Sequence, residues 1–194
     1  MKIYDISQEL TGCVVFPGDM TPKKEIVSDI TKGDLYNLTN ISLCTHNGTH
    51  VDAPFHFLKD GKTIENIPLE KYIGPCCLVC HNGDFTAQDV KNLITDKMTE
   101  FPKRILISGD ATVMPDAAKL FADNGIYLIG NESQSVGPES APMEVHKILL
   151  SEDVVLLEGL RLSGIKPGEY FLCAAPLNIA GSDGSPCRAV LIEF

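Results

Sequence analysis

Short runs of apolar residues, some continuous and some alternating with polar residues, recur along the whole chain. Runs of this length are typical of β-strands. They predict strands over residues 2–7, 38–44, 72–81, 104–108, 125–130, 153–157, 170–174 and 188–194. The chain is therefore expected to be built largely on β-structure.

Helical spacing of apolar residues is less frequent and lies mostly in the middle of the chain. It predicts three helices, over residues 87–93, 116–123 and 142–150. Val90, Leu93 and Ile94 form the apolar face of the first. Strands outnumber helices and alternate with them only in this middle region, which indicates a mixed α/β or α+β fold. No repeat or linker divides the sequence, so we expect one domain over residues 1–194.

The charge balance excludes several classes of partner. The 194 residues carry 16 Lys and Arg against 26 Asp and Glu, a formal net charge of −10 without any basic block. Binding to nucleic acid or to an anionic membrane needs clustered cations, so neither is expected as a partner. No apolar run approaches the roughly 18 residues that span a bilayer, and no secretion signal opens the chain. We expect a cytoplasmic protein.

The cysteines and glycines offer little chemistry. Seven cysteines are an odd number at irregular spacing, and several lie within apolar runs, which is typical of reduced core residues. Cys77 and Cys80 form a C-x-x-C, but no second pair follows at zinc-site spacing. The glycine-rich segment 181–185 lacks a phosphate-loop pattern and is interpreted as a turn, and no G-x-S-x-G nucleophile motif occurs.

One segment concentrates metal-binding residue types. His46, His50, Asp52 and His56 fall within eleven residues, although the chain has only five histidines. Gly48, β-branched neighbours and a proline disfavour a helix here. On an extended path His50 and Asp52 share a face, and a turn at Gly48 can bring His46 to the same point. Imidazole nitrogens with a carboxylate suit Zn²⁺ or Mn²⁺. His56 is either a further ligand or an acid/base group, and the remaining histidine, His81, is interpreted as a turn residue.

The same segment resembles a known family. From His46 to His56 the sequence matches every fixed position of the pattern H-x-G-T/A-H-x-D-x-P-x-H, which is typical of the cyclase-like metal hydrolases that include bacterial kynurenine formamidase and isatin hydrolase. The resemblance extends over nearly the whole chain, through residues 5–7, 16–19, 67–75, 176–177 and 184–190. It implies the family's swivelling β/β/α domain.

The resemblance also implies a complete site. A second His and Glu, twelve residues apart in the family, correspond to His146 and Glu158. The implied ligands of one or two Zn²⁺ or Mn²⁺ ions per subunit are His46, His50, Asp52, His146 and Glu158. His56 then acts as general base in the hydrolysis of a carbon–nitrogen bond of an aryl formamide or cyclic amide. Phe16 corresponds to the family's substrate-facing aromatic, and the expected assembly is a homodimer or homotetramer.

Other interpretations remain open from the residues. Glu158 could instead be a solvated residue at the end of a strand, and His146 an ordinary residue on a helix face. Phe16 could simply pack within its loop. The sequence also departs from the family pattern. The segment 108–116 is shorter than the corresponding family region, and Gly130-Asn131-Glu132 stands where the family has a Gly-x-Asp motif. The chain contains no tryptophan. The alternatives are a hydrolase or cyclase acting on another small amide or lactone, and a metal- or small-molecule-binding protein of the same fold without catalysis.

Overall fold

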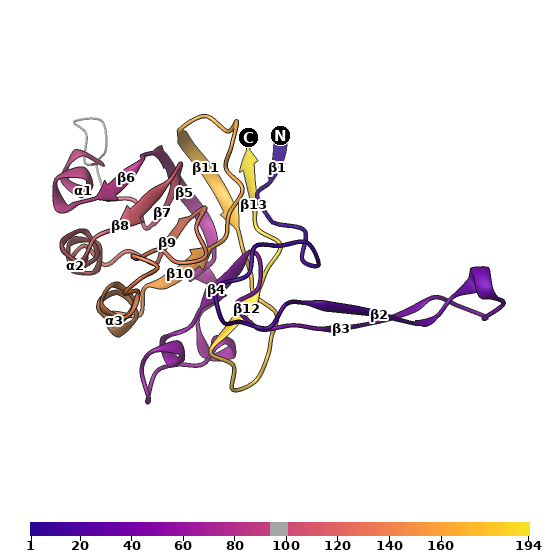
Figure 1. The fold of residues 1–194 in the computed structure, drawn as a ribbon. Helices are drawn as coiled ribbons and strands as arrows, with labels where there is room; N and C mark the ends of the chain where they lie inside the picture. Colours follow the sequence, from indigo (N-terminus) through magenta and orange to yellow (C-terminus); the bar gives the residue numbers. More distant parts are fainter. Residues whose placement is uncertain (94–100) are drawn as a thin grey trace.

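A long mixed sheet organises the molecule (Figure 1). The computed structural model describes residues 1–93 and 101–194, and within these ranges nine strands form one sheet in the order β1-β13-β11-β5-β7-β9-β10-β4-β12. The strands span β1 Lys2–Asp5, β4 His50–Asp52, β5 Ile73–Cys80, β7 Arg104–Ser108, β9 Leu128–Asn131, β10 Val155–Glu158, β11 Gly168–Cys173, β12 Gly184–Pro186 and β13 Val190–Glu193.

The middle of the sheet is parallel and its two ends are antiparallel. Strands β5, β7, β9 and β10 run parallel to one another. Helices α1 (Ala87–Leu93), α2 (Pro115–Asp123) and α3 (Met143–Ser151) lie side by side along this part of the sheet (Figure 1). Ile105 and Ile107 of β7 pack in the core on the helix side, and Leu106 packs in the core on the opposite face. Burial on both faces explains the continuous apolar run of Ile105, Leu106 and Ile107 in β7.

The pattern of apolar residues predicted most of these elements. Each of the eight predicted strands and three predicted helices coincides with an observed element, and the mixed α+β class is confirmed. Val90 is buried in α1 and Leu93 packs against the same core, whereas Ile94 lies outside the described residues. The first strand ends two residues earlier than predicted, because the Ser7 amide turns back to donate to the Asp5 carboxylate at 3.2 Å.

Several short elements were not predicted. Strand β2 (Lys23–Ser28), which pairs with the predicted strand β3 (Leu38–Ser42), is one of them, and β6 (Gly83–Phe85) and β8 (Ala111–Val113), which pair with each other, are two more. The interpretation of residues 181–185 as a turn is wrong at its end, because Gly184 begins strand β12 opposite Asp52. Short 3-10 helices occur at η1 (Ile30–Lys32), η2 (Pro54–His56), η3 (Ile64–Asn66) and η4 (Leu69–Lys71). Of the helices described, none is long and apolar enough to cross a membrane.

Candidate functional site

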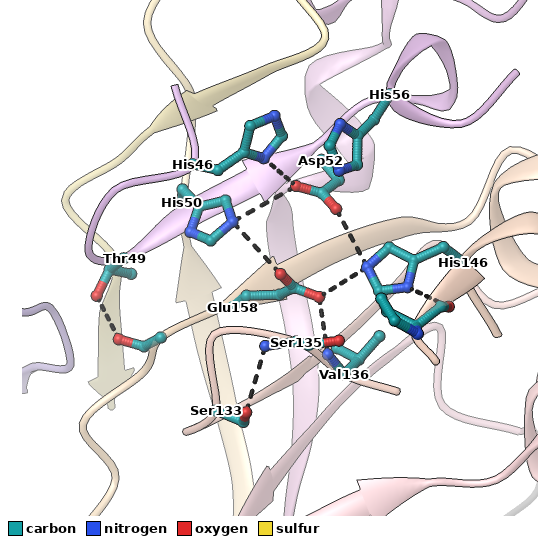
Figure 2. Close-up of polar contacts among 12 residues, drawn as sticks. His46, Thr49, His50, Asp52, His56, Ser133, Ser135, Val136, His146 and Glu158 are labelled. Carbon is teal, nitrogen blue, oxygen red and sulfur yellow. Dashed lines mark hydrogen bonds and ion pairs between the residues drawn. The ribbon is translucent and has the colours of Figure 1, made fainter. Parts of the chain in front are cut away.

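Sheet pairing brings the first three site residues together. Strand β4 carries His50 and Asp52, whose side chains share a face because they are two residues apart. Strand β10 pairs with β4 so that Glu158 lies directly opposite His50. His50 Nε2 is 3.3 Å from Glu158 Oε2 and 3.5 Å from Asp52 Oδ1 (Figure 2). The predicted common face of His50 and Asp52 is therefore confirmed.

A left-handed turn adds His46 to this group. Gly48 has φ 66, a conformation that residues with a side chain rarely adopt. This turn reverses the chain before β4 and places His46 Nδ1 at 2.9 Å from Asp52 Oδ1 (Figure 2). The role predicted for Gly48 is thus confirmed.

Helix α3 supplies His146 from the other side of the cluster. Its Nε2 atom is 3.2 Å from Glu158 Oε1 and 3.5 Å from Asp52 Oδ2. Glu158 Oε1 also accepts the Val136 amide at 2.8 Å. Glu158 is buried, so the alternative of a solvated strand end is wrong; His146 is buried as well, with its ring directed at the carboxylates.

The two most deeply buried imidazoles present the same nitrogen to the cluster. His50 Nδ1 contacts the Gly48 carbonyl oxygen at 3.0 Å, and His146 Nδ1 contacts the Pro142 carbonyl oxygen at 2.8 Å. A carbonyl can only accept, so each Nδ1 carries the hydrogen and each neutral ring has its lone pair on Nε2. Metal-binding histidines are commonly oriented in this way.

The donor set fits a divalent cation. Each Nε2 lone pair faces carboxylate oxygens, and two acceptors at such distances repel each other unless a proton or a metal ion lies between them. Among the residues that the structure describes, the buried Oδ2 atom of Asp52 has no hydrogen-bond partner. Two overlapping sets, each with ligand atoms within 4.8 Å of one another, share this aspartate: His46, His50 and Asp52, and Asp52, His146 and Glu158.

The electrostatics of the cluster favour cations. Burial by itself lowers the pKa of His46, but the Asp52 charge and the hydrogen bonds to Asp183 and Asp52 outweigh it and raise this pKa to about 11. Burial likewise lowers the pKa of His146, and its contact with Glu158 outweighs this and raises it to about 9. The paired carboxylates thus hold protons on the imidazoles, and a metal ion would displace these protons on binding.

His56 lies beside the cluster rather than inside it. It ends the 3-10 helix η2, and 27% of its side chain is exposed, against 4% or less for His50, Asp52, His146 and Glu158. Its ring packs against that of His46, with centroids 4.0 Å apart and the ring planes tilted by 32°, and its Nδ1 atom is 3.5 Å from Asp183 Oδ2. The position gives His56 access to the pocket that opens over the cluster.

This pocket has a cavity volume of about 240 Å³ and partly apolar walls. Phe16, on the loop before β2, lines it together with Phe57 and Pro142, and so do Glu158 and four histidines, His46, His50, His56 and His146. A cavity of about 150 Å³ is enough to hold benzene. The pocket therefore has room for a small ligand with one aromatic ring.

Sequence reasoning missed several polar residues at the site, among them Asp183 and Ser135. Asp183 contacts both His46 and His56, but its segment was interpreted as a simple turn. Ser135 lines the pocket, and within the described ranges its buried hydroxyl has no hydrogen-bond partner. Neither residue lies in a periodic pattern, and the resemblance in residues 184–190 stops one residue short of Asp183.

The C-x-x-C does not form part of any such cluster. Cys77 and Cys80 are three residues apart on β5, so their side chains point to opposite faces of the sheet. Among the residues described, the groups with metal-binding geometry contain no cysteine.

The chain is similar to known hydrolases in both sequence and structure. The Cyclase family model, described as "Putative cyclase", matches residues 4–138. Kynurenine formamidase from Erythrobacter litoralis (strain HTCC2594) is 34% identical over 204 residues, covering 100% of this chain and 94% of that protein. A solved structure described as a potential metal-dependent hydrolase with cyclase activity is 31% identical with a TM-score of 0.82, covering 98% of this chain and 96% of the other.

A more distant likeness concerns the fold alone. Isatin hydrolase A from Labrenzia aggregata, solved with benzyl benzoate bound, is 21% identical with a TM-score of 0.84, covering 100% of this chain and 94% of the other. The fold expected from the resemblance is therefore confirmed.

Proposed function

This chain belongs to the cyclase family, and on that basis we propose that it is a metal-dependent hydrolase that cleaves a carbon–nitrogen bond of a small amide. The observation that carries the proposal is the buried cluster in which the Nε2 atoms of His50 and His146 face the carboxylates of Asp52 and Glu158 at 3.2–3.5 Å. The similarity to proteins described as a kynurenine formamidase and a metal-dependent hydrolase supports the same activity.

We propose that His46, His50, Asp52, His146 and Glu158 hold one or two divalent ions. Imidazole with carboxylate suits Zn²⁺ or Mn²⁺, and the two oxygens of Asp52 and of Glu158 allow either residue to bridge a pair of ions. When bound, such an ion polarises a scissile carbonyl and lowers the pKa of water.

The proposed role of His56 follows from its position. Its Nδ1 atom faces Asp183, which leaves Nε2 for the pocket. At Nε2 it would accept a proton from the attacking water as the new carbon–oxygen bond forms. It would then give this proton to the leaving nitrogen as the carbon–nitrogen bond breaks, so that the products are an amine and a carboxylic acid.

The pocket walls support an aryl formamide or a cyclic amide as substrate. Phe16 and Phe57 offer ring surfaces, and a flat substrate ring can pack against them. The volume of about 240 Å³ limits the substrate to a small molecule. Kynurenine formamidase, the relative named above, belongs by its name to the same substrate class.

Turnover by metal-stripped and reloaded protein tests this function. We expect N-formylkynurenine, isatin or formanilide to be hydrolysed by protein loaded with Zn²⁺ or Mn²⁺, and turnover to stop after removal of the metal with a chelator. The midpoint of thermal unfolding should fall on stripping and recover on reloading, because a ligand that binds only the native state stabilises it. Metal binding without turnover of any of these amides would instead favour a binding protein of the same fold.

We further propose that the chain assembles as a homodimer or homotetramer through residues 23–42, here called the arm. The arm contains β2, η1 and β3 and projects from the body (Figure 1). A two-stranded hairpin by itself is marginally stable in water, so packing against a second copy would stabilise it. Its apolar side chains are exposed, namely Ile26, Val27, Ile30, Leu35, Tyr36, Leu38 and Ile41.

Light scattering after gel filtration tests the assembly. We expect a mass two or four times that of the 21.1 kDa chain. Leu35 and Tyr36 are 94% and 58% exposed near the tip of the arm, and replacing both with glutamate should reduce the mass toward that of one chain. A wild-type protein that elutes as a monomer at micromolar concentration would contradict the proposal.

A further inference from the structure

We propose that Asp183 is a positioning residue that holds both His46 and His56 in the tautomers that the reaction needs. Its Oδ2 atom is 3.0 Å from His46 Nε2 and 3.5 Å from His56 Nδ1, so a single oxygen faces a proposed ligand and the proposed general base. The inference rests on the hydrolase function proposed above.

Hydrogen bonds and backbone packing fix the position of the Asp183 carboxylate. The Asp183 carbonyl accepts the Ala53 amide at 2.9 Å, which fastens residue 183 to the end of β4. The Thr45 hydroxyl donates to Asp183 Oδ1 at 3.1 Å, leaving Oδ2 for the two imidazoles. A Cβ added to Gly184 would lie 2.7 Å from His46 Cε1, so the backbone rests directly against the ring.

For His46, the contact determines which nitrogen faces the cluster. His50 and His146 donate from Nδ1 to carbonyl oxygens and present Nε2 inward. His46 is turned the other way, with Nε2 on Asp183 and Nδ1 2.9 Å from Asp52 Oδ1. When Nε2 carries the hydrogen, the lone pair is on Nδ1 and points at the cluster. A carboxylate partner also makes an imidazole a more basic ligand than a carbonyl partner does.

For His56, the same oxygen leaves the pocket-facing nitrogen available. A hydrogen on Nδ1 directed at Asp183 places the lone pair on Nε2, where a base must accept its proton. The His56 ring also packs against that of His46, with centroids 4.0 Å apart. Contacts of catalytic groups often tighten when substrate binds, which is consistent with the 3.5 Å separation here.

The test compares zinc-loaded wild-type protein with Asp183→Asn. Nitrogen-15 spectra of the histidine rings report which ring nitrogen carries the hydrogen, and chelator competition reports zinc affinity. We expect His56 to carry its hydrogen on Nδ1 in the wild type and to lose this preference in the variant. Zinc affinity should fall about 10- to 100-fold, and kcat should fall about 100-fold or more while KM changes little.

Asp153→Asn is the matched control. Its side chain is 41% exposed, as is that of Asp183, but it pairs with Lys62 outside the pocket. This variant should keep the spectra, the zinc affinity and kcat of the wild type. If Asp183→Asn behaves like the control, the positioning role is wrong.

The experiment also gives an answer if the wild type shows no turnover or if Asp183→Asn does not fold. The ring spectra and the zinc affinity need no substrate, so they test Asp183 even if the wild type hydrolyses none of the amides offered. If Asp183→Asn does not fold, Thr45→Val removes only the hydroxyl that fixes Oδ1 and should produce smaller changes in the same direction. Wild-type spectra and zinc affinity in that variant would then count against the proposal.

Discussion

Replacement of His56 with alanine is expected to abolish most of the hydrolytic activity while the protein keeps its metal. The side chain lies at the pocket, beside the buried cluster of proposed ligands, so its loss leaves those five residues in place. Removal of a general base typically costs 10²- to 10⁴-fold in rate. The measurement is kcat together with metal content determined by elemental analysis on the same preparation.

His81→Ala is the control for this variant. It is the one histidine outside the site, its side chain is 25% exposed against 27% for His56, and it contacts the Asp84 carbonyl oxygen. Activity and metal content should both stay near the wild type. Loss of metal from His56→Ala would identify His56 as a ligand, which is the interpretation that the sequence leaves open beside the acid/base role.

The sequence predicts a helix or strand well where the local pattern of apolar residues determines it. It predicts a strand poorly where the strand forms only by pairing with a segment distant in the sequence. Strand β7 is buried along its whole length and has the apolar run Ile105, Leu106 and Ile107 at its centre, so its pattern alone identifies it. Strands β4 and β12 have three residues each, and they exist as strands because they pair with each other, and β4 with β10. Strand β2 was not predicted because it opens with Lys23, Lys24 and Glu25 and its two apolar residues are adjacent, so its sequence has no strand period.

The same distinction applies to the site. His46, His50 and Asp52 are close in sequence, so the turn at Gly48 and a short strand are enough to bring them together. Asp183 joins His46 across 137 residues and only because Gly184 pairs with Asp52, a register that no local signal encodes.

The replaced Gly-x-Asp motif shows how a departure from a family pattern can be structural. The Asn131 side chain donates to the Ala111 and Ser135 carbonyls, and the Glu132 carboxylate accepts the Gly109 and Leu162 amides. Both side chains therefore fasten loops near the pocket instead of joining the ligand cluster.

Glu158→Gln is expected to weaken metal binding more than any change outside the cluster. The carboxylate reaches both His50 and His146 and accepts the Val136 amide, so the amide side chain has the right size but lacks the negative charge. Its NH₂ group would also point a hydrogen where a cation should bind. We expect metal affinity to fall at least about 100-fold. Residues that only hydrogen-bond to a metal ligand typically cost 10- to 100-fold when they are replaced, and a ligand itself should cost no less.

The stability of the loaded protein gives this prediction a readout independent of turnover. A 100-fold weaker affinity removes about 2.7 kcal/mol of the stabilisation that saturating metal provides, and this corresponds to a shift of roughly 5–10 °C in Tm for a chain of this size. Glu132→Gln is the control, because it makes the same chemical change at a carboxylate that accepts only backbone amides. The Tm of this variant without metal can fall, but the rise in Tm on adding metal should equal that of the wild type. A Glu158→Gln protein that keeps both its metal content and the full rise in Tm would remove Glu158 from the ligand set and leave His46, His50 and Asp52 as the metal-binding group.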